Sequence, residues 1–217
     1  MEISKSLTQT LKKSELTGLI VDNSEVVLDA ACSDEIIKAI PVFSDIYKVY
    51  SVVSTVRASL FQKQMYAFLF ELKDIKPQKR ETLLKKLDSK EGENQSLGEE
   101  LIVMLEQFSN VRKSTIYARL FRHLLLENID KETFKRFAHI LNQIFEGDIQ
   151  NLISFYTDEP ISEYSQIALE NLGLITIERR STKYIKALGS FNGKIIEKPK
   201  QNELGKLFFD LISETTK

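Results

Sequence analysis

The side chains most often used for catalysis or metal binding are sparse in this sequence. Two histidines occur, His123 and His139, and the single cysteine is Cys32. A structural zinc site usually takes four ligands, mostly Cys and His at short spacings, so these histidines would need carboxylates from another helix to form one. We therefore predict that both are helix residues partly buried beside Phe121 and Phe137, and that Cys32 is a small packing residue.

The short motifs of phosphate-binding loops, zincins and serine hydrolases are absent from the sequence, which has no G-x-x-x-x-G-K-[ST], G-x-G-x-x-G, H-E-x-x-H or G-x-S-x-G. The acidic pairs Glu99 with Glu100 and Asp130 with Glu132 are explained by the favourable placement of carboxylates in the first turn of a helix. The second pair also lacks the glycine and terminal glutamate of an EF-hand loop. We therefore predict no enzyme activity, no metal ion and no cofactor.

One stretch has a charge asymmetry that suits binding rather than catalysis. Between positions 179 and 200 a single acidic residue, Glu197, accompanies seven basic ones: Arg179, Arg180, Lys183, Lys186, Lys194, Lys198 and Lys200. In a winged-helix fold this stretch would form the wing, where phosphate contacts occur. The helix expected to enter the DNA groove, 162–172, has Glu163 and Glu170 and no basic residue. A solvated basic hairpin is the simpler interpretation; contact with nucleic acid, an acidic protein or an anionic membrane stays open.

The composition is that of a globular chain from a reducing compartment. The 217 residues are 42% hydrophobic and 28% charged, and the formal net charge is -1. This balance removes the whole-protein attraction to nucleic acid that most nucleic-acid-binding proteins show. One cysteine cannot form an internal disulfide, and the first twenty residues contain no apolar run like a signal-peptide core. We therefore expect a cytoplasmic protein.

The most apolar region, 36–72, predicts a long amphipathic helix rather than a membrane span. Charged residues interrupt it too often for the roughly 20 largely apolar residues that a span requires. From Pro41 to Leu72 apolar residues recur at steps of three and four, namely Val42, Ile46, Val49, Val53, Val56 and Leu60 and then Phe61, Met65, Phe68 and Leu72. This spacing predicts one helix, bent or straight. Packing in a core is favoured for its apolar face, with attachment to a membrane surface as the alternative.

Further helices are predicted on both sides of this region. Residues 1–35 are expected to form a separate, helical N-terminal segment, and a short helix is predicted over 77–87. Ser96 and Glu99 have the spacing of a capping box that opens a helix to about residue 108. A helical face follows over 113–126. Asp130 is a good N-cap for the clearest amphipathic helix, which reaches residue 145 and is expected to end or bend at Gly147.

The pattern changes after residue 157. A short helix over 162–172 stops at Gly173, the alternating LITIER follows as a strand, and a turn-rich GSFNG precedes a second strand-like piece at 194–197. A helix around 204–212 closes the chain. The fold class is thus predicted as mainly α, a multi-helix bundle over 36–157 with a C-terminal winged-helix-like helix/β-hairpin/helix module over 158–217.

Three phrases resemble the abortive-infection alpha family, small bacterial proteins associated with phage defence. They are AIPVFSDIYK at 39–48, ENLGLITIE at 170–178 and ELGKLFFDLI at 203–212, with a helical middle between the first two. The resemblance extends from about residue 36 to 213 and implies a role in phage defence without implying any catalytic residue. The leading hypothesis is a non-enzymatic helical protein that acts through protein contacts. A DNA-binding regulator using the basic hairpin and a membrane-associating effector using 40–72 are the alternatives, and homo-oligomerisation stays open.

Overall fold

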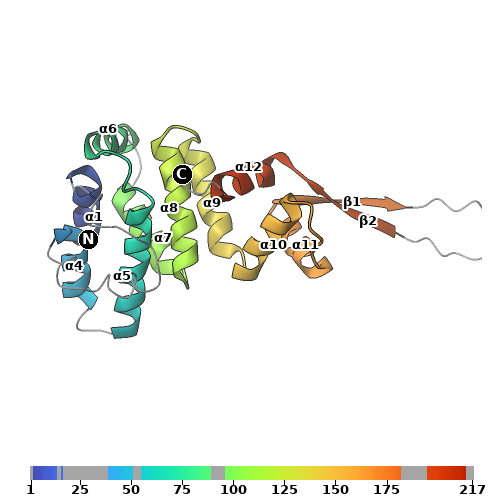
Figure 1. Cartoon of the computed structure of the whole chain (residues 1–217), viewed down its shortest axis with the longest axis horizontal. Helices are drawn as coiled ribbons and strands as arrows, with labels where there is room; N and C mark the ends of the chain where they lie inside the picture. The colour runs from blue at the N-terminus through green and yellow to red at the C-terminus, as the bar shows by residue number, and fades with distance from the viewer. Residues whose placement is uncertain are drawn as a thin grey trace, which may run out of the picture. The chain divides into compact units, whose positions relative to one another are not determined.

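The computed structural model describes residues 2–13, 16, 39–50, 55–88, 96–181 and 195–213. The chain is mostly helical, and near its C-terminus two antiparallel strands precede a final helix (Figure 1). The predicted fold class is therefore confirmed at the level of a helical protein with a C-terminal hairpin followed by a helix. The residues group into two compact units, which we call the N-terminal unit, 1–142, and the C-terminal unit, 143–215.

The N-terminal unit is formed by helices. They are α1 (Glu2–Lys13), α4 (Pro41–Tyr50), α5 (Thr55–Phe70), α6 (Pro77–Asp88), α7 (Leu97–Gln107), α8 (Val111–Leu125) and α9 (Lys131–Gln143). α1 buries Ile3, Leu7 and Leu11, which recur every four residues and so share one face of the helix. This helix contacts α4, α6 and α7. The N-terminal helix is thus an integral part of the core of its unit.

The single helix predicted from Pro41 to Leu72 is wrong, because two separate helices occupy the described part of this region. α4 packs against α5, which two halves of one straight helix could not do. Val49 is 46% exposed and Val56 79% exposed, although the predicted stripe placed both on the buried face. Spacings of three and four residues mark a helical face but do not mark where one helix stops and the next begins. Val53 lies outside the described residues.

Aromatic side chains from three helices form the centre of the N-terminal unit. Phe68 of α5 stacks on Phe121 of α8 with ring centroids 5.6 Å apart, and Tyr117 of α8 stacks on Phe134 of α9 at 5.4 Å. Offset and tilted pairs at such separations contribute beyond the area that they bury. Burial raises the pKa of the Tyr117 phenol far above its ordinary value of 10.0, because the phenolate would lose its hydration. This cluster holds α5, α8 and α9 together.

The predicted helix starts at Ser96 and Asp130 are confirmed. The Ser96 hydroxyl accepts a hydrogen bond from the backbone N–H of Glu99, and the Glu99 carboxylate accepts one from the N–H of Ser96, which is the reciprocal capping box. Asp130 Oδ1 accepts from the N–H of Thr133 at 2.7 Å. The prediction that Gly147 ends or bends the helix after Asp130 is wrong. That helix ends at Gln143, and Gly147 lies in the first turn of the next helix.

The C-terminal unit consists of α10 (Glu146–Tyr156), α11 (Glu163–Asn171), β1 (Ile175–Ser181), β2 (Ile195–Gln201) and α12 (Glu203–Ser213). The unit begins earlier than the boundary expected between 157 and 158, because α10 packs on α11 and α12. Gly173 ends α11 with a positive φ of 72°. The N–H of Leu174 donates to the Leu169 carbonyl and the N–H of Gly173 to that of Glu170, the two bonds of a Schellman motif.

The two strands pair in antiparallel register, with Ile175 opposite Gln201 and Arg179 opposite Glu197 (Figure 1). Ile175 and Ile177 are buried, and α11 contacts β1. Side chains two residues apart share a face of a strand, so Arg179 lies on the same face as these two isoleucines. The hairpin therefore directs Arg179 toward α11, the helix that precedes it.

Candidate functional site

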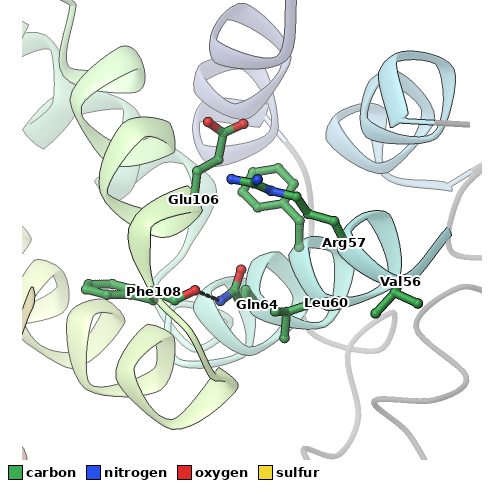
Figure 2. Close-up of a pocket in the computed structure, with 7 residues that line it drawn as sticks. Val56, Arg57, Leu60, Gln64, Glu106 and Phe108 are labelled. Atoms are coloured by element: carbon green, nitrogen blue, oxygen red, sulfur yellow. Dashed lines mark hydrogen bonds between the residues drawn. The ribbon is translucent and has the colours of Figure 1, made fainter. Parts of the chain in front are cut away.

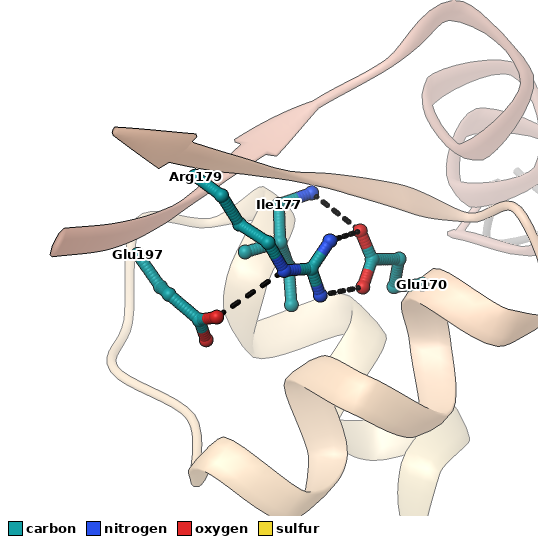
Figure 3. A network of polar contacts seen from close by, with 4 residues as sticks. All are labelled: Glu170, Ile177, Arg179 and Glu197. Atoms are coloured by element: carbon teal, nitrogen blue, oxygen red, sulfur yellow. Dashed lines mark hydrogen bonds and ion pairs between the residues drawn. The ribbon is translucent and has the colours of Figure 1, made fainter. Parts of the chain in front are cut away.

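The basic hairpin predicted as a binding site contains one arginine whose charge is already compensated. The guanidinium of Arg179 donates to both carboxylate oxygens of Glu170 on α11, with Nη1–Oε1 at 3.1 Å and Nη2–Oε2 at 2.7 Å (Figure 3). Arg179 Nε also lies 3.2 Å from Oε1 of Glu197 on β2. Two carboxylates thus surround one guanidinium, and the bidentate pair is the geometry in which arginine binds a carboxylate most strongly.

Glu170 accepts a third hydrogen bond, from the backbone N–H of Ile177 at 3.1 Å. The pKa of Glu170 is lowered below its ordinary value of 4.5, first by the hydrogen bond from Arg179 and further by that from Ile177. The pKa of Arg179 is raised, chiefly by the hydrogen bond with Glu170. Both groups stay charged near neutral pH, so the network fixes α11 against the hairpin rather than presenting a free cation.

The other predicted basic residues are not brought together as one described site. Lys200 Nζ pairs with Glu178 Oε2 at 2.9 Å across the two strands. Lys198 is exposed, and it forms no ion pair with any residue that the structure describes. Arg180 lies in β1 opposite Ile196. Lys183, Lys186 and Lys194 lie outside the described residues, so the structure leaves the predicted phosphate contacts at these positions untested.

Both histidines lie among the described residues, His123 on α8 and His139 on α9. His123 is buried, as predicted, and its Nδ1 lies 3.0 Å from Nδ2 of Asn128. His139 is exposed, which corrects the prediction that it is partly buried; its position on α9 faces away from Phe137 and Leu141. Within the described ranges no three His, Cys, Asp or Glu residues lie close enough together to hold a metal ion. Cys32 lies outside these ranges.

A pocket of about 380 Å³ lies between α5 and the end of α7 in the N-terminal unit (Figure 2). Its lining consists of Val56, Arg57, Leu60, Phe61, Gln64, Glu106 and Phe108. The buried amide of Gln64 donates from Nε2 to the Phe108 carbonyl oxygen at 2.8 Å, which satisfies a backbone acceptor just after α7 ends. The Gln64 amide in this pocket is thus engaged by the backbone, and the lining includes one basic and one acidic side chain, Arg57 and Glu106.

The apolar residues that would contact lipid in the membrane alternative are largely inside the N-terminal unit. Val42 and Ile46 of α4 and Phe61, Met65 and Phe68 of α5 are buried. In the part of the chain that the structure describes, no helix combines the length and the apolar character needed to cross a bilayer. Core packing, the favoured use of this face, therefore accounts for most of the predicted stripe.

Among the described residues of the C-terminal unit, the large hydrophobic side chain with the highest exposed fraction belongs to α11. Tyr164 is 87% exposed, and Ile167, one turn later on the same face, is 49% exposed. The opposite face of α11 buries Ser165 and Leu169. Single exposed apolar residues are ordinary on protein surfaces, but an aromatic and a β-branched residue side by side on one exposed helix face are typical of contact surfaces. We call Tyr164 and Ile167 the α11 contact pair.

The sequence on both sides of this pair lacks basic residues over a long stretch. Residues 143–178 include no Lys, Arg or His, whereas they include seven acidic residues: Glu146, Asp148, Asp158, Glu159, Glu163, Glu170 and Glu178. This acidic run stands directly before the basic run at 179–200 and was not predicted as part of a site. A count of charge in successive windows would have revealed it, although only the structure shows that Glu170 and Glu178 are paired with basic residues.

No family model, no curated protein and no solved structure matches this chain. The resemblance to the abortive-infection alpha family stays a prediction from the three sequence phrases.

Proposed function

We propose that this protein acts through contacts with another protein, and that the α11 contact pair is the centre of that surface. The exposure of Tyr164 and Ile167 on the outer face of α11 carries the proposal. Tyrosine supplies a large rigid contact area at a low cost in side-chain entropy, and it is enriched among the residues that dominate binding energy. The rest of the C-terminal unit serves as the scaffold that holds α11 in place.

The electrostatics of the same helix favour a protein partner over nucleic acid. In a winged-helix arrangement α11 would approach the DNA groove, yet it presents Glu163 and no basic side chain. Arg179, the basic residue nearest to this helix along β1, is bound by Glu170 and Glu197. If Arg179 were to contact a phosphate, it would exchange its two ion pairs, with Glu170 and Glu197, for one phosphate contact. The regulator hypothesis therefore depends on Lys198, which is exposed, and on the lysines that lie outside the described residues.

The proposed role in bacterial phage defence is supported by the sequence resemblance at 39–48, 170–178 and 203–212. A non-enzymatic contact protein fits an abortive-infection role in which a binding event, rather than turnover, transmits the signal. This role is tested by expressing the chain in a phage-sensitive bacterium and counting plaques. The Tyr164→Ala variant, which is expected to lose the contact function, is expressed for comparison. Equal plaque numbers with the wild-type chain, the variant and an empty vector would remove it.

The experiment that tests the contact function is affinity capture with the full-length chain from host lysate at two salt concentrations. The chain is compared with Tyr164→Ala and with Tyr47→Ala, a matched control because Tyr47 is also an exposed helical tyrosine, 56% exposed on α4. We expect one protein at constant ratio to be retained by wild type and by Tyr47→Ala and lost with Tyr164→Ala. Recovery mainly of nucleic acid that is released as salt rises would contradict the proposal.

A further inference from the structure

The sequence around the α11 contact pair carries exposed carboxylates that form no ion pair with any residue that the structure describes. Glu163 is exposed in the first turn of α11, directly before Tyr164, and forms no ion pair within the described ranges. Glu159 is exposed in the connection between α10 and α11, where its Oε2 accepts a hydrogen bond from the Ser154 hydroxyl at 2.9 Å. A neutral hydroxyl satisfies the carboxylate oxygen without cancelling its charge.

Asp158 adds a third carboxylate in the same connection, and it is exposed with a positive φ of 63°. Positions 158, 159 and 163 all lie within six residues of Tyr164 along the chain. Of the described basic residues of the hairpin, Arg179 and Lys200 are engaged by Glu170 and Glu178, whereas Lys198 is exposed on β2. The segment that opens α11 thus carries three exposed carboxylates, which we call the acidic border, directly before the apolar contact pair in the sequence.

From this combination we infer that the partner presents a basic amphipathic segment, with apolar side chains that cover Tyr164 and Ile167 and Lys or Arg side chains that reach Glu159 and Glu163. The inference rests on the proposed contact function and specifies the chemistry of its partner. An apolar pair alone would accept any apolar surface, whereas an acidic border repels acidic partners, nucleic acid and anionic membranes and attracts basic ones. Charge complementarity also steers the approach of such a segment at low salt.

The test uses the full-length chain and a synthetic 14-residue peptide of Leu and Lys in helical spacing, with the same peptide carrying Glu in place of Lys as its counterpart. We expect binding of the Leu/Lys peptide, measured by fluorescence anisotropy at 50 mM and 300 mM salt, and no binding of the Leu/Glu peptide. Tyr164→Ala should weaken binding about tenfold, the equivalent of one well-packed contact.

Glu163→Lys should weaken binding of the Leu/Lys peptide at least threefold at 50 mM salt and less at 300 mM, because salt screens exposed charges. The matched control is Glu132→Lys, since Glu132 is likewise an exposed first-turn glutamate, on α9. Equal effects of Glu163→Lys and Glu132→Lys, or equal binding of the two peptides, would overturn the inference. Sedimentation velocity of the chain alone adds a further outcome, because a dimer lost in Tyr164→Ala would assign the pair to a second copy and likewise overturn it.

Failure of this inference is distinguishable from failure of the proposed function. If capture from lysate requires Tyr164 but is unchanged by Glu163→Lys, the contact function stands and the basic partner does not. If capture is unaffected by Tyr164→Ala, the contact function itself fails, whatever the peptides do.

Discussion

The phenol oxygen of Tyr156 at the end of α10 donates a hydrogen bond to the carbonyl oxygen of Leu174, 2.8 Å away, in the segment that leads from α11 into β1. The same oxygen lies 3.2 Å from the carbonyl oxygen of Asn202, the residue before α12. Asn202 in turn donates from Nδ2 to the Gly173 carbonyl and accepts from the N–H of Gly205 at 2.7 Å. One tyrosine thus joins three elements of the scaffold that holds the α11 contact pair.

Replacement of Tyr156 by Phe should destabilise the C-terminal unit by about 1–3 kcal/mol, because the buried Leu174 carbonyl loses its side-chain donor while the ring remains. Hydrogen exchange of the α12 amides, compared between wild type and Tyr156→Phe, measures this loss within the C-terminal unit. Exchange rates in α8 should not change. Faster exchange in both units alike would show that the effect is not local to this bond.

The same residue predicts a loss of stability in alkali. Burial raises the pKa of Tyr156 above its ordinary value of 10.0, because it penalises the phenolate. A raised folded-state pKa means that the neutral phenol contributes its full stability below pH 10 and loses it as the pH rises through the folded-state pKa. Tyr156→Phe should therefore be less stable than wild type at pH 8 but lose less stability between pH 9 and 11. Urea unfolding of both proteins at several pH values in this range measures the difference in stability. An equal loss of stability in the two proteins would contradict the assignment of this effect to the Tyr156 phenol.

Gly205 is expected to tolerate no side chain. A Cβ at this position would overlap the carbonyl oxygen of Leu174 and the hydroxyl of Tyr156. In an open helix Gly→Ala stabilises by up to about 1 kcal/mol, but here the overlap with backbone should dominate and cost about 1–3 kcal/mol or more. Thermal unfolding with Gly147→Ala as the control decides which effect prevails, because a Cβ at Gly147 meets only the exposed ring of Phe145. A stabilised Gly205→Ala would show that α12 can move away from Leu174.

A buried carboxylate in the N-terminal unit supports a further prediction about stability. Glu71 is 3% exposed, its Oε1 lies 3.3 Å from Arg119 Nε, and its backbone carbonyl accepts from Arg122 Nη1 at 3.2 Å. Arg119→Met should destabilise the unit by about 2–5 kcal/mol, because a buried charge loses a partner. The double variant Glu71→Met/Arg119→Met should recover part of this loss, since it leaves no uncompensated carboxylate. Chemical unfolding measures the stability of both variants. A double variant less stable than Arg119→Met would contradict the idea that the Glu71 carboxylate causes the loss.

Much of the helical architecture was predictable from local signals. The capping box at Ser96, the N-cap at Asp130 and the helix stop at Gly173 depend on neighbours within a few residues, and the structure confirms all three. The break between α4 and α5 was not predictable in this way, because the apolar spacing continues through it. The packing of α4 against α5 is a tertiary contact that this spacing does not encode, and Val49 and Val56 are exposed rather than buried.

The candidate site was predictable only in part, for a related reason. The basic run at 179–200 is visible in the sequence, but its pairing partners are not adjacent to it. Glu170 lies nine residues before Arg179 and meets it only because the hairpin folds back onto α11. Charge counted along a chain therefore overstates the positive surface of this hairpin, and the exposure of Tyr164 follows from which face of α11 packs inward rather than from its residue type.

The ion pair between Glu170 and Arg179 predicts how the surface around α11 responds to acid. The pKa of Glu170 lies below 4.5, chiefly because Arg179 donates hydrogen bonds to its carboxylate. A lowered folded-state pKa gives a contribution that is present above pH 4.5 and is lost as the pH falls through the folded-state value. Arg179 is exposed and Glu170 is partly exposed, so the expected effect is local rather than a loss of the fold.

Arg179→Gln should therefore raise the pKa of Glu170 toward 4.5, as measured by carboxyl ¹³C chemical shifts between pH 2 and 7. Lys206→Gln is the matched control, since Lys206 also forms an exposed carboxylate pair in this unit, with Asp210, but does not contact Glu170. Binding of the Leu/Lys peptide should strengthen in Arg179→Gln, because Glu170 then adds an uncompensated charge beside the α11 contact pair. An unchanged pKa of Glu170 would mean that its backbone bond from Ile177, rather than Arg179, sets the protonation of this carboxylate.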